Sequence, residues 1–136
     1  QTIDTVVIAS DGNATDFGDL GYTPHTCVAA SGSTKGFGYS GWTNGAYFNH
    51  IRVYNISSDG DATDFGDVSE GRYSATGCAD KLKAFHIGGQ TASSQAVTQI
   101  DVWVQESAGN STDFGDLTSR SRTQSMSSAC AAHGGI

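Results

Sequence analysis

The hexapeptide Thr15-Asp16-Phe17-Gly18-Asp19-Leu20 decides the fold of this 136-residue chain, because it occurs three times with small changes. Its other copies run from Thr63 to Val68 and from Thr112 to Leu117. The copies are about 48 residues apart, a period typical of repeat architectures such as solenoids and propellers. We therefore interpret the chain as one domain with repeat units at residues 3–49, 50–98 and 99–136.

A strand pattern precedes each hexapeptide. β-Branched and aromatic residues are dense there, which favours an extended backbone. These predicted strands are Ile3–Ile8, Ile51–Ile56 and Ile100–Val104. Turn residues then link each strand to its hexapeptide, at Ser10–Asn13, Ser58–Asp61 and Ala108–Asn110. Since no segment keeps a helical apolar period beyond a turn or two, the sequence predicts an all-β fold with about four short strands per repeat.

A single cysteine follows each hexapeptide, at Cys27, Cys78 and Cys130. An odd number of thiols without a Cys-x-x-Cys pair argues against a disulfide framework and against a zinc site. We interpret all three as small buried core residues outside any disulfide. An apolar run that ends in glycine comes next, most clearly at Lys83–Gly89.

Taken in order, these pieces resemble a kelch repeat. The likeness consists of a strand ending in Gly88-Gly89, a variable loop, the strand Ile100–Val104, a turn, and an aromatic edge strand followed by Arg72 or Arg120. Phenylalanine stands where kelch repeats usually have tryptophan, and the first repeat has Ser40-Gly41 in place of the glycine pair. The hexapeptide also resembles the NATDFGDL-type repeats of structural proteins in marine tailed phages.

The kelch resemblance implies a β-propeller of four-stranded blades. In that order the chain begins with the two outer strands of one blade and ends with two inner strands, around Ser128–Gly135. Three blades cannot close a ring, since propellers have about four or more. We therefore predict a homodimer of six blades, in which the N- and C-terminal ends of two chains share each junction blade. A β-trefoil or a β-prism is the alternative, because three repeats in one chain also fit internal three-fold symmetry.

The charge balance argues against some partners. Fourteen acidic residues against seven basic ones give a net charge of −7, and the sequence has no cluster of Lys and Arg. A phosphate backbone is bound by a basic surface, so we expect no nucleic-acid partner. No apolar window of about 18 residues occurs, so we expect no membrane span.

The aspartate-rich turns suggest calcium, a cation that takes about six to eight oxygen ligands. Two features weaken this hypothesis: the spacing lacks a terminal bidentate Glu, and Ala108 replaces the leading Asp in the third repeat. We favour a structural role, in which Asp16, Asp19 and their equivalents bond turn amides and hold the edge strand. No other cofactor is expected. The candidate calcium ligands are Asp11, Asn13, Asp16, Asp59, Asp61 and Asp64.

The remaining motifs do not indicate an enzyme. The sequence has no nucleophile elbow, no supported Ser/His/Asp grouping and no Gly-rich phosphate loop. The histidines have no matching acid in the sequence, so we interpret them as structural or surface residues: His25, His50, His86 and His133. One aromatic at the same place in every repeat is typical of packing between neighbouring units, which predicts a core role for Phe17, Phe65 and Phe114.

We predict a non-enzymatic structural or binding module that presents its loops for recognition of a surface ligand or a glycan. The loop after the first apolar run contains Trp42, Asn44 and Tyr47, residue types that stack on a sugar and hydrogen-bond to it. The phage resemblance implies a virion-associated or extracellular structural module that presents such loops to a surface ligand. A stand-alone carbohydrate-binding lectin is the alternative.

Overall fold

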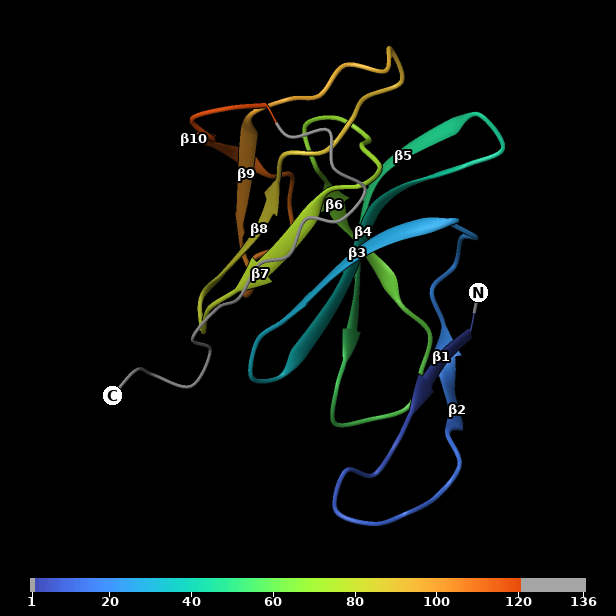
Figure 1. Ribbon diagram of the computed structural model, residues 1–136. Coiled ribbons are helices and arrows are strands. Elements are labelled where there is room, and N and C mark those ends of the chain that lie inside the picture. Colours follow the sequence, from blue (N-terminus) through green and yellow to red (C-terminus); the bar gives the residue numbers. More distant parts are fainter. Residues whose placement is uncertain (1, 121–136) are drawn as a thin grey trace.

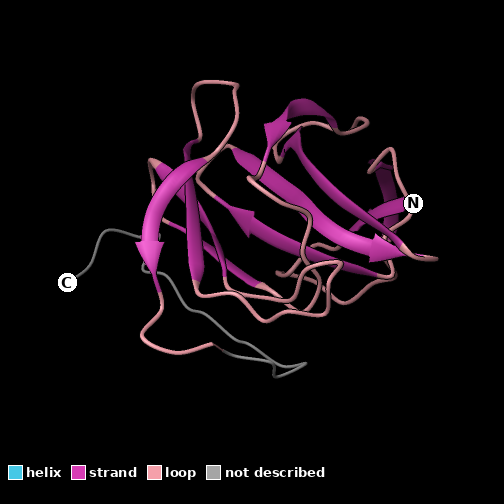
Figure 2. Cartoon of the chain, turned by 90° about the horizontal axis from the view of Figure 1, so that it is seen from above, coloured by secondary structure: helices cyan, strands magenta, loops and turns pink. Residues whose placement is uncertain are grey.

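The structure is a computed structural model that describes residues 2–120, and in this range it contains strands and loops only (Figure 2). The predicted all-β class is confirmed. The strands are β1 (Thr2–Thr5), β2 (Thr15–Asp19), β3 (Thr26–Ser31), β4 (Lys35–Thr43), β5 (Ala46–Asn55), β6 (Thr63–Asp67), β7 (Thr76–Ala79), β8 (Lys83–Ile87), β9 (Gln99–Val104) and β10 (Thr112–Asp116). Within residues 2–120 there is no helix that is long and apolar enough to cross a membrane.

The strands form three antiparallel sheets (Figure 1). One sheet has two strands, β1-β2, and the other two have four strands each, in the orders β3-β4-β5-β6 and β7-β8-β9-β10. The hexapeptide forms an edge strand of every sheet, as β2, β6 and β10. Each four-stranded sheet therefore combines the end of one sequence repeat with the start of the next.

The first strand is shorter than predicted. β1 ends at Thr5, and the next three residues, which were predicted to continue it, are exposed: Val6 by 59%, Val7 by 69% and Ile8 by 98%. The equivalent strands β5 and β9 have neighbours on both sides, whereas β1 pairs only with β2 among the described residues. Pairing on one side alone leaves the end of β1 without support. The two inner strands predicted around Ser128–Gly135 lie outside the described residues.

The cysteine prediction is correct in part. Cys27 and Cys78 form no disulfide, but Cys27 is exposed and Cys78 is only partly buried. The reason is strand alternation, because Val28 takes the core-facing position of β3 and turns Cys27 outward. Cys130 lies outside the described residues.

The core lies between the two four-stranded sheets, where β3 packs against β7 and β8. Phe37 and Tyr39 of β4 are fully buried, and their rings meet Trp103 of β9 edge to face, with centroid distances of 5.9 and 4.7 Å. The Tyr39 hydroxyl donates to the Phe85 carbonyl at 2.7 Å and so links the two sheets. The other members of the core are Val28, Ile51, Phe65, Val68, Ala79 and Ala84.

A β-bulge in each hexapeptide frees part of its backbone. The pairing register shifts at the phenylalanine, so that Phe17, Phe65 and Phe114 have no partner residue in their own ladder. The glycine after each of them has a positive φ that L side chains rarely adopt, 150° at Gly18, 151° at Gly66 and 144° at Gly115. The bulge thereby turns backbone groups toward a neighbouring repeat.

The first two bulges dock on the turn of the following repeat. Gly60 N–H donates to the Phe17 carbonyl (2.7 Å), and Ala62 N–H donates to the Asp19 carbonyl (2.8 Å). Asp61 Oδ1 accepts from Asp19 N–H at 2.9 Å. The second docking has the same three bonds: Gly109 N–H to the Phe65 carbonyl (2.7 Å), Ser111 N–H to the Asp67 carbonyl (2.8 Å), and Asp67 N–H to Asn110 Oδ1 (3.0 Å). We call this set of three bonds the motif–turn junction.

The junction explains which phenylalanines are buried. Phe17 is 9% exposed and Phe65 is 6% exposed, as predicted for core residues, but Phe114 is 59% exposed and the prediction is wrong there. The Phe17 ring packs edge to face on Tyr54 of the next repeat, at 5.9 Å. Phe114 packs on Phe85 of its own sheet at 5.2 Å, and the described residues contain no following repeat to cover it.

Candidate functional site

An open cavity of about 510 Å³ lies beside the β4–β5 hairpin. Trp42 of β4 and Tyr47 of β5 form a cross-strand pair and contribute two of the aromatic rings in its wall. Two more rings and two hydroxyl groups come from residues on the flanking segments. These are His25, Thr26, Tyr73 and Ser74.

The hairpin turn sets the positions of Trp42 and Tyr47. Thr43 pairs with Ala46, so the loop consists of Asn44-Gly45, with φ angles of 47° and 87°. Asn-Gly is the preferred sequence for this left-handed two-residue turn, because its twist matches that of the paired strands. The turn fixes the register, and the register places the indole opposite the phenol on the same face.

The rings in the cavity wall hold one another in place. His25 stands edge to face with Trp42 at 5.2 Å, and Tyr47 stands edge to face with Tyr73 at 6.0 Å. His25 N–H also donates to the Trp42 carbonyl (2.8 Å), and the Tyr73 hydroxyl donates to Gln90 Oε1 (2.6 Å). Trp42 and Tyr47 remain partly exposed. The result is a fixed aromatic surface with polar groups at its margin, which is typical of small-molecule sites.

The structure brings together two of the three predicted ligand residues. Trp42 and Tyr47 line the aromatic cavity, whereas Asn44 lies in the hairpin turn and borders a separate depression. Sequence reasoning missed the other four lining residues because they belong to segments distant in the sequence. The strongest available signal was Tyr73, because this aromatic residue directly follows Arg72, one of the residues on which the kelch resemblance rests.

The first aspartate of the hexapeptide bonds a backbone amide of its own bulge in β2 and β10. Asp16 Oδ1 accepts from Gly18 N–H, and Asp113 Oδ1 accepts from Gly115 N–H, both at 3.2 Å. The junction role of Asp61 and its equivalent was missed, because it links different repeats. No three His, Cys, Asp or Glu side chains in the described part of the chain group so as to hold a metal. Calcium binding stays a prediction for Asp11, Asn13, Asp16, Asp59, Asp61 and Asp64.

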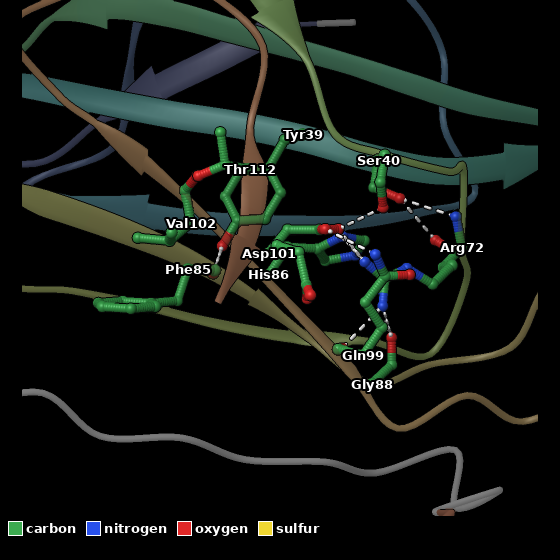
Figure 3. A network of polar contacts seen from close by, with 12 residues as sticks. Tyr39, Ser40, Arg72, Phe85, His86, Gly88, Gln99, Asp101, Val102 and Thr112 are labelled. Carbon is green, nitrogen blue, oxygen red and sulfur yellow. Dashed lines mark hydrogen bonds and ion pairs between the residues drawn. The ribbon is translucent and has the colours of Figure 1, made fainter. Parts of the chain in front are cut away.

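A buried polar cluster connects the two four-stranded sheets (Figure 3). Arg72, in the β6–β7 connection, forms an ion pair with Asp101 of β9, and both side chains are fully buried. Its guanidinium also donates to the carbonyls of Gly88 (2.9 Å) and Gln99 (3.0 Å). Ser40 of β4 donates to the Arg72 carbonyl (2.8 Å) and accepts from its N–H (2.9 Å). Arg72 thereby ties β4, β9 and the residue after β8 to the segment that follows the hexapeptide.

Burial and neighbouring charge set the protonation states in this cluster. Burial lowers the pKa of His86 to about 4, so its ring is neutral near pH 7. Burial alone would raise the pKa of Asp101, but the hydrogen bond with His86 and the charge of Arg72 hold this pKa below its usual value. His86, Arg72 and Asp101 have no exposed surface. A substrate cannot reach them in this structure, which favours a structural role for the cluster.

Two histidines depart from their predicted surroundings. His50 Nδ1 lies 3.2 Å from Asp67 Oδ1, and His86 Nδ1 lies 3.6 Å from Asp101 Oδ2, so each has an acidic neighbour that the sequence alone did not indicate. The pairing arises because β5 and β6 are adjacent, as are β8 and β9. His133 lies outside the described residues.

No protein-family model matches the chain, and no curated protein sequence is significantly similar to it. The geometry of the cavity and the repeat motifs are therefore the basis on which a function can be proposed.

Proposed function

We propose that the protein is a non-enzymatic glycan-binding module whose site is the aromatic cavity between Trp42, Tyr47, Tyr73 and His25. The observation that carries the proposal is the convergence of four rings and two hydroxyl groups on one open cavity. The apolar face of a sugar ring stacks on aromatic side chains, and its hydroxyls exchange hydrogen bonds with Ser, Thr and His. A net charge of −7 favours neutral glycans over acidic ones, since like charges repel.

We further propose that the two four-stranded sheets are blades of a kelch-like β-propeller, and that two copies of the chain close a ring of six blades. Both sheets have the same sequential strand order, and the β1-β2 sheet corresponds to the outer half of a third blade. Such a ring presents its loops rigidly, which suits recognition of a surface ligand. The hexapeptide resemblance supports a place on a virion or another extracellular structure. A stand-alone lectin would use the same cavity.

Tryptophan fluorescence tests the proposed sugar site. The chain has two tryptophans, and Trp103 is 3% exposed in the core, so a sugar-induced change in emission reports on Trp42. After a glycan array identifies a sugar, we expect Trp42→Ala to weaken its binding by at least about tenfold, because an aromatic anchor contributes about 2 kcal/mol or more to binding. Calorimetry measures the affinity, and Trp42→Phe removes the fluorescence signal.

Asn44→Gly is the matched control, because it changes the same hairpin outside the cavity and keeps a residue that tolerates positive φ. It should bind the sugar like the original protein. An array without any bound glycan, or equal affinity for the Trp42→Ala variant, would contradict the proposal and favour a purely structural module.

A further inference from the structure

The third hexapeptide has the form of a junction without its partner. β10 has the same bulge as β2 and β6, and Gly115 has a φ of 144°, close to the values at Gly18 and Gly66. A Cβ on Gly18 would lie 2.3 Å from the Gly60 carbonyl oxygen, but a Cβ on Gly115 meets no atom within 4 Å. The backbone is thus already shaped for a turn that no described residue supplies.

The first turn of the chain is the matching half. Asp11-Gly12-Asn13 precedes β2 just as Asp59-Gly60-Asp61 precedes β6, and it has the Gly and the Asx side chain that the junction uses. Gly12 does not have the positive φ of Gly60 (155°), so docking would reorder this turn, and glycine permits that change. Residues 121–136 contain no Asp or Asn, the residue types whose side chains accept a bond in the two observed junctions.

Exposed apolar side chains accompany both halves. By its place after β1, Val6 corresponds to Tyr54, the residue on which Phe17 packs across the first junction. Val6 and Phe114 are each 59% exposed. Bringing them together would bury two large apolar side chains that the single chain leaves in water.

The two halves cannot meet within one molecule. Figures 1 and 2 place β10 and the β1-β2 hairpin on opposite sides of the β3-β4-β5-β6 sheet. The first turn of a second copy of this chain has the sequence that would fill the third hexapeptide. A head-to-tail contact of this kind closes into a ring when the rotation between copies allows it.

We propose that the third hexapeptide docks on the first turn of a second copy of this chain. Gly12 N–H and Ala14 N–H donate to the carbonyls of Phe114 and Asp116, and Asn13 Oδ1 accepts from Asp116 N–H. Phe114 then packs on Val6 of the second copy. This contact names the residues that join the two copies in the ring proposed above, and it does not depend on sugar binding.

Sedimentation velocity of the whole chain at micromolar concentration tests this contact. We expect twice the 14.1 kDa of one chain. Gly115→Ala should reduce the mass to that of one chain, because its Cβ would clash with the Gly12 carbonyl of the second copy. Gly109→Ala is the control for backbone strain: its φ is 154°, a Cβ there meets nothing within 4 Å, and we expect it to remain a dimer.

A second variant tests the other half of the contact. Ala14→Pro removes the N–H expected to bond Asp116, in a loop that precedes β2. We expect this variant and Gly115→Ala to be monomers when each is alone, and to form a dimer through one intact contact when mixed. A monomeric original chain would overturn both the ring and this contact. A dimer that persists in Gly115→Ala, or a mixture that stays monomeric, would overturn the contact and leave a ring closed by other surfaces.

Discussion

Gly66→Ala is expected to lower the free energy of unfolding by about 3 kcal/mol more than Gly109→Ala. A Cβ on Gly66 would lie 2.2 Å from the Gly109 carbonyl oxygen, an atom of the backbone that cannot rotate away. The two repeats must separate to admit the methyl group. Separation weakens the three bonds of the second junction and opens the core around Phe65.

Gly109→Ala isolates the cost of the junction from the cost of backbone strain. Gly66 and Gly109 have φ angles of 151° and 154°, so alanine is similarly unfavourable at both, but a Cβ on Gly109 meets no atom within 4 Å. Urea unfolding followed by circular dichroism gives both free energies. Equal losses for the two variants would mean that contact between the repeats adds nothing to stability.

Arg72→Met should destabilise the protein by about 4 kcal/mol, because it leaves the carboxylate of Asp101 buried without its ion pair. The carbonyls of Gly88 and Gln99 lose their donor as well. Asp101→Leu should cost a similar amount, since a buried guanidinium remains. Such a loss is a large part of the total stability of an ordinary domain, which is about 5 to 15 kcal/mol.

The double variant separates the ion pair from simple packing. If the two buried charges stabilise each other, the double variant Arg72→Met with Asp101→Leu should lose clearly less free energy of unfolding than the two single variants lose in sum. Glu106→Gln is the control at an exposed ion pair, Lys35–Glu106 at 3.1 Å, and should cost less than about 1 kcal/mol. Urea unfolding again provides the free energies, and additive losses at Arg72 and Asp101 would contradict coupling.

Sequence periodicity predicted the hairpins that form within a single repeat. The hexapeptide and its flanking strands indicated the β5-β6 and β9-β10 hairpins, because alternating β-branched residues and Gly-containing turns are local signals. Asn44-Gly45 is a turn signal of the same kind, but Trp42 and Tyr47 were predicted to lie in a loop. They belong to β4 and β5 and pair across the hairpin. Trp42 and Tyr47, which lie in this one stretch of sequence, are two of the six residues that line the cavity.

Contacts between repeats were not predictable in the same way. The positions equivalent to Asp101 are Asp4 and Arg52, so the ion pair with Arg72 does not recur with the period and leaves no repeated pattern. His25 reaches the cavity through the pairing of β3 with β4, and Tyr73 through the connection between β6 and β7, so neither contact is local in the sequence. Phe114 shows the same limit, because an identical residue is buried where a neighbouring repeat covers it and exposed where none does.

Amide hydrogen exchange measured by NMR tests most directly whether motif–turn junctions hold the repeats together. The informative amides are those of Gly60, Ala62, Gly109 and Ser111, which donate across the two junctions. We expect them to exchange much more slowly than the amide of Gly45 in the exposed hairpin turn, because they open only when the repeats separate. Exchange as fast as that of Gly45 would contradict the junctions and the arrangement of repeats built on them.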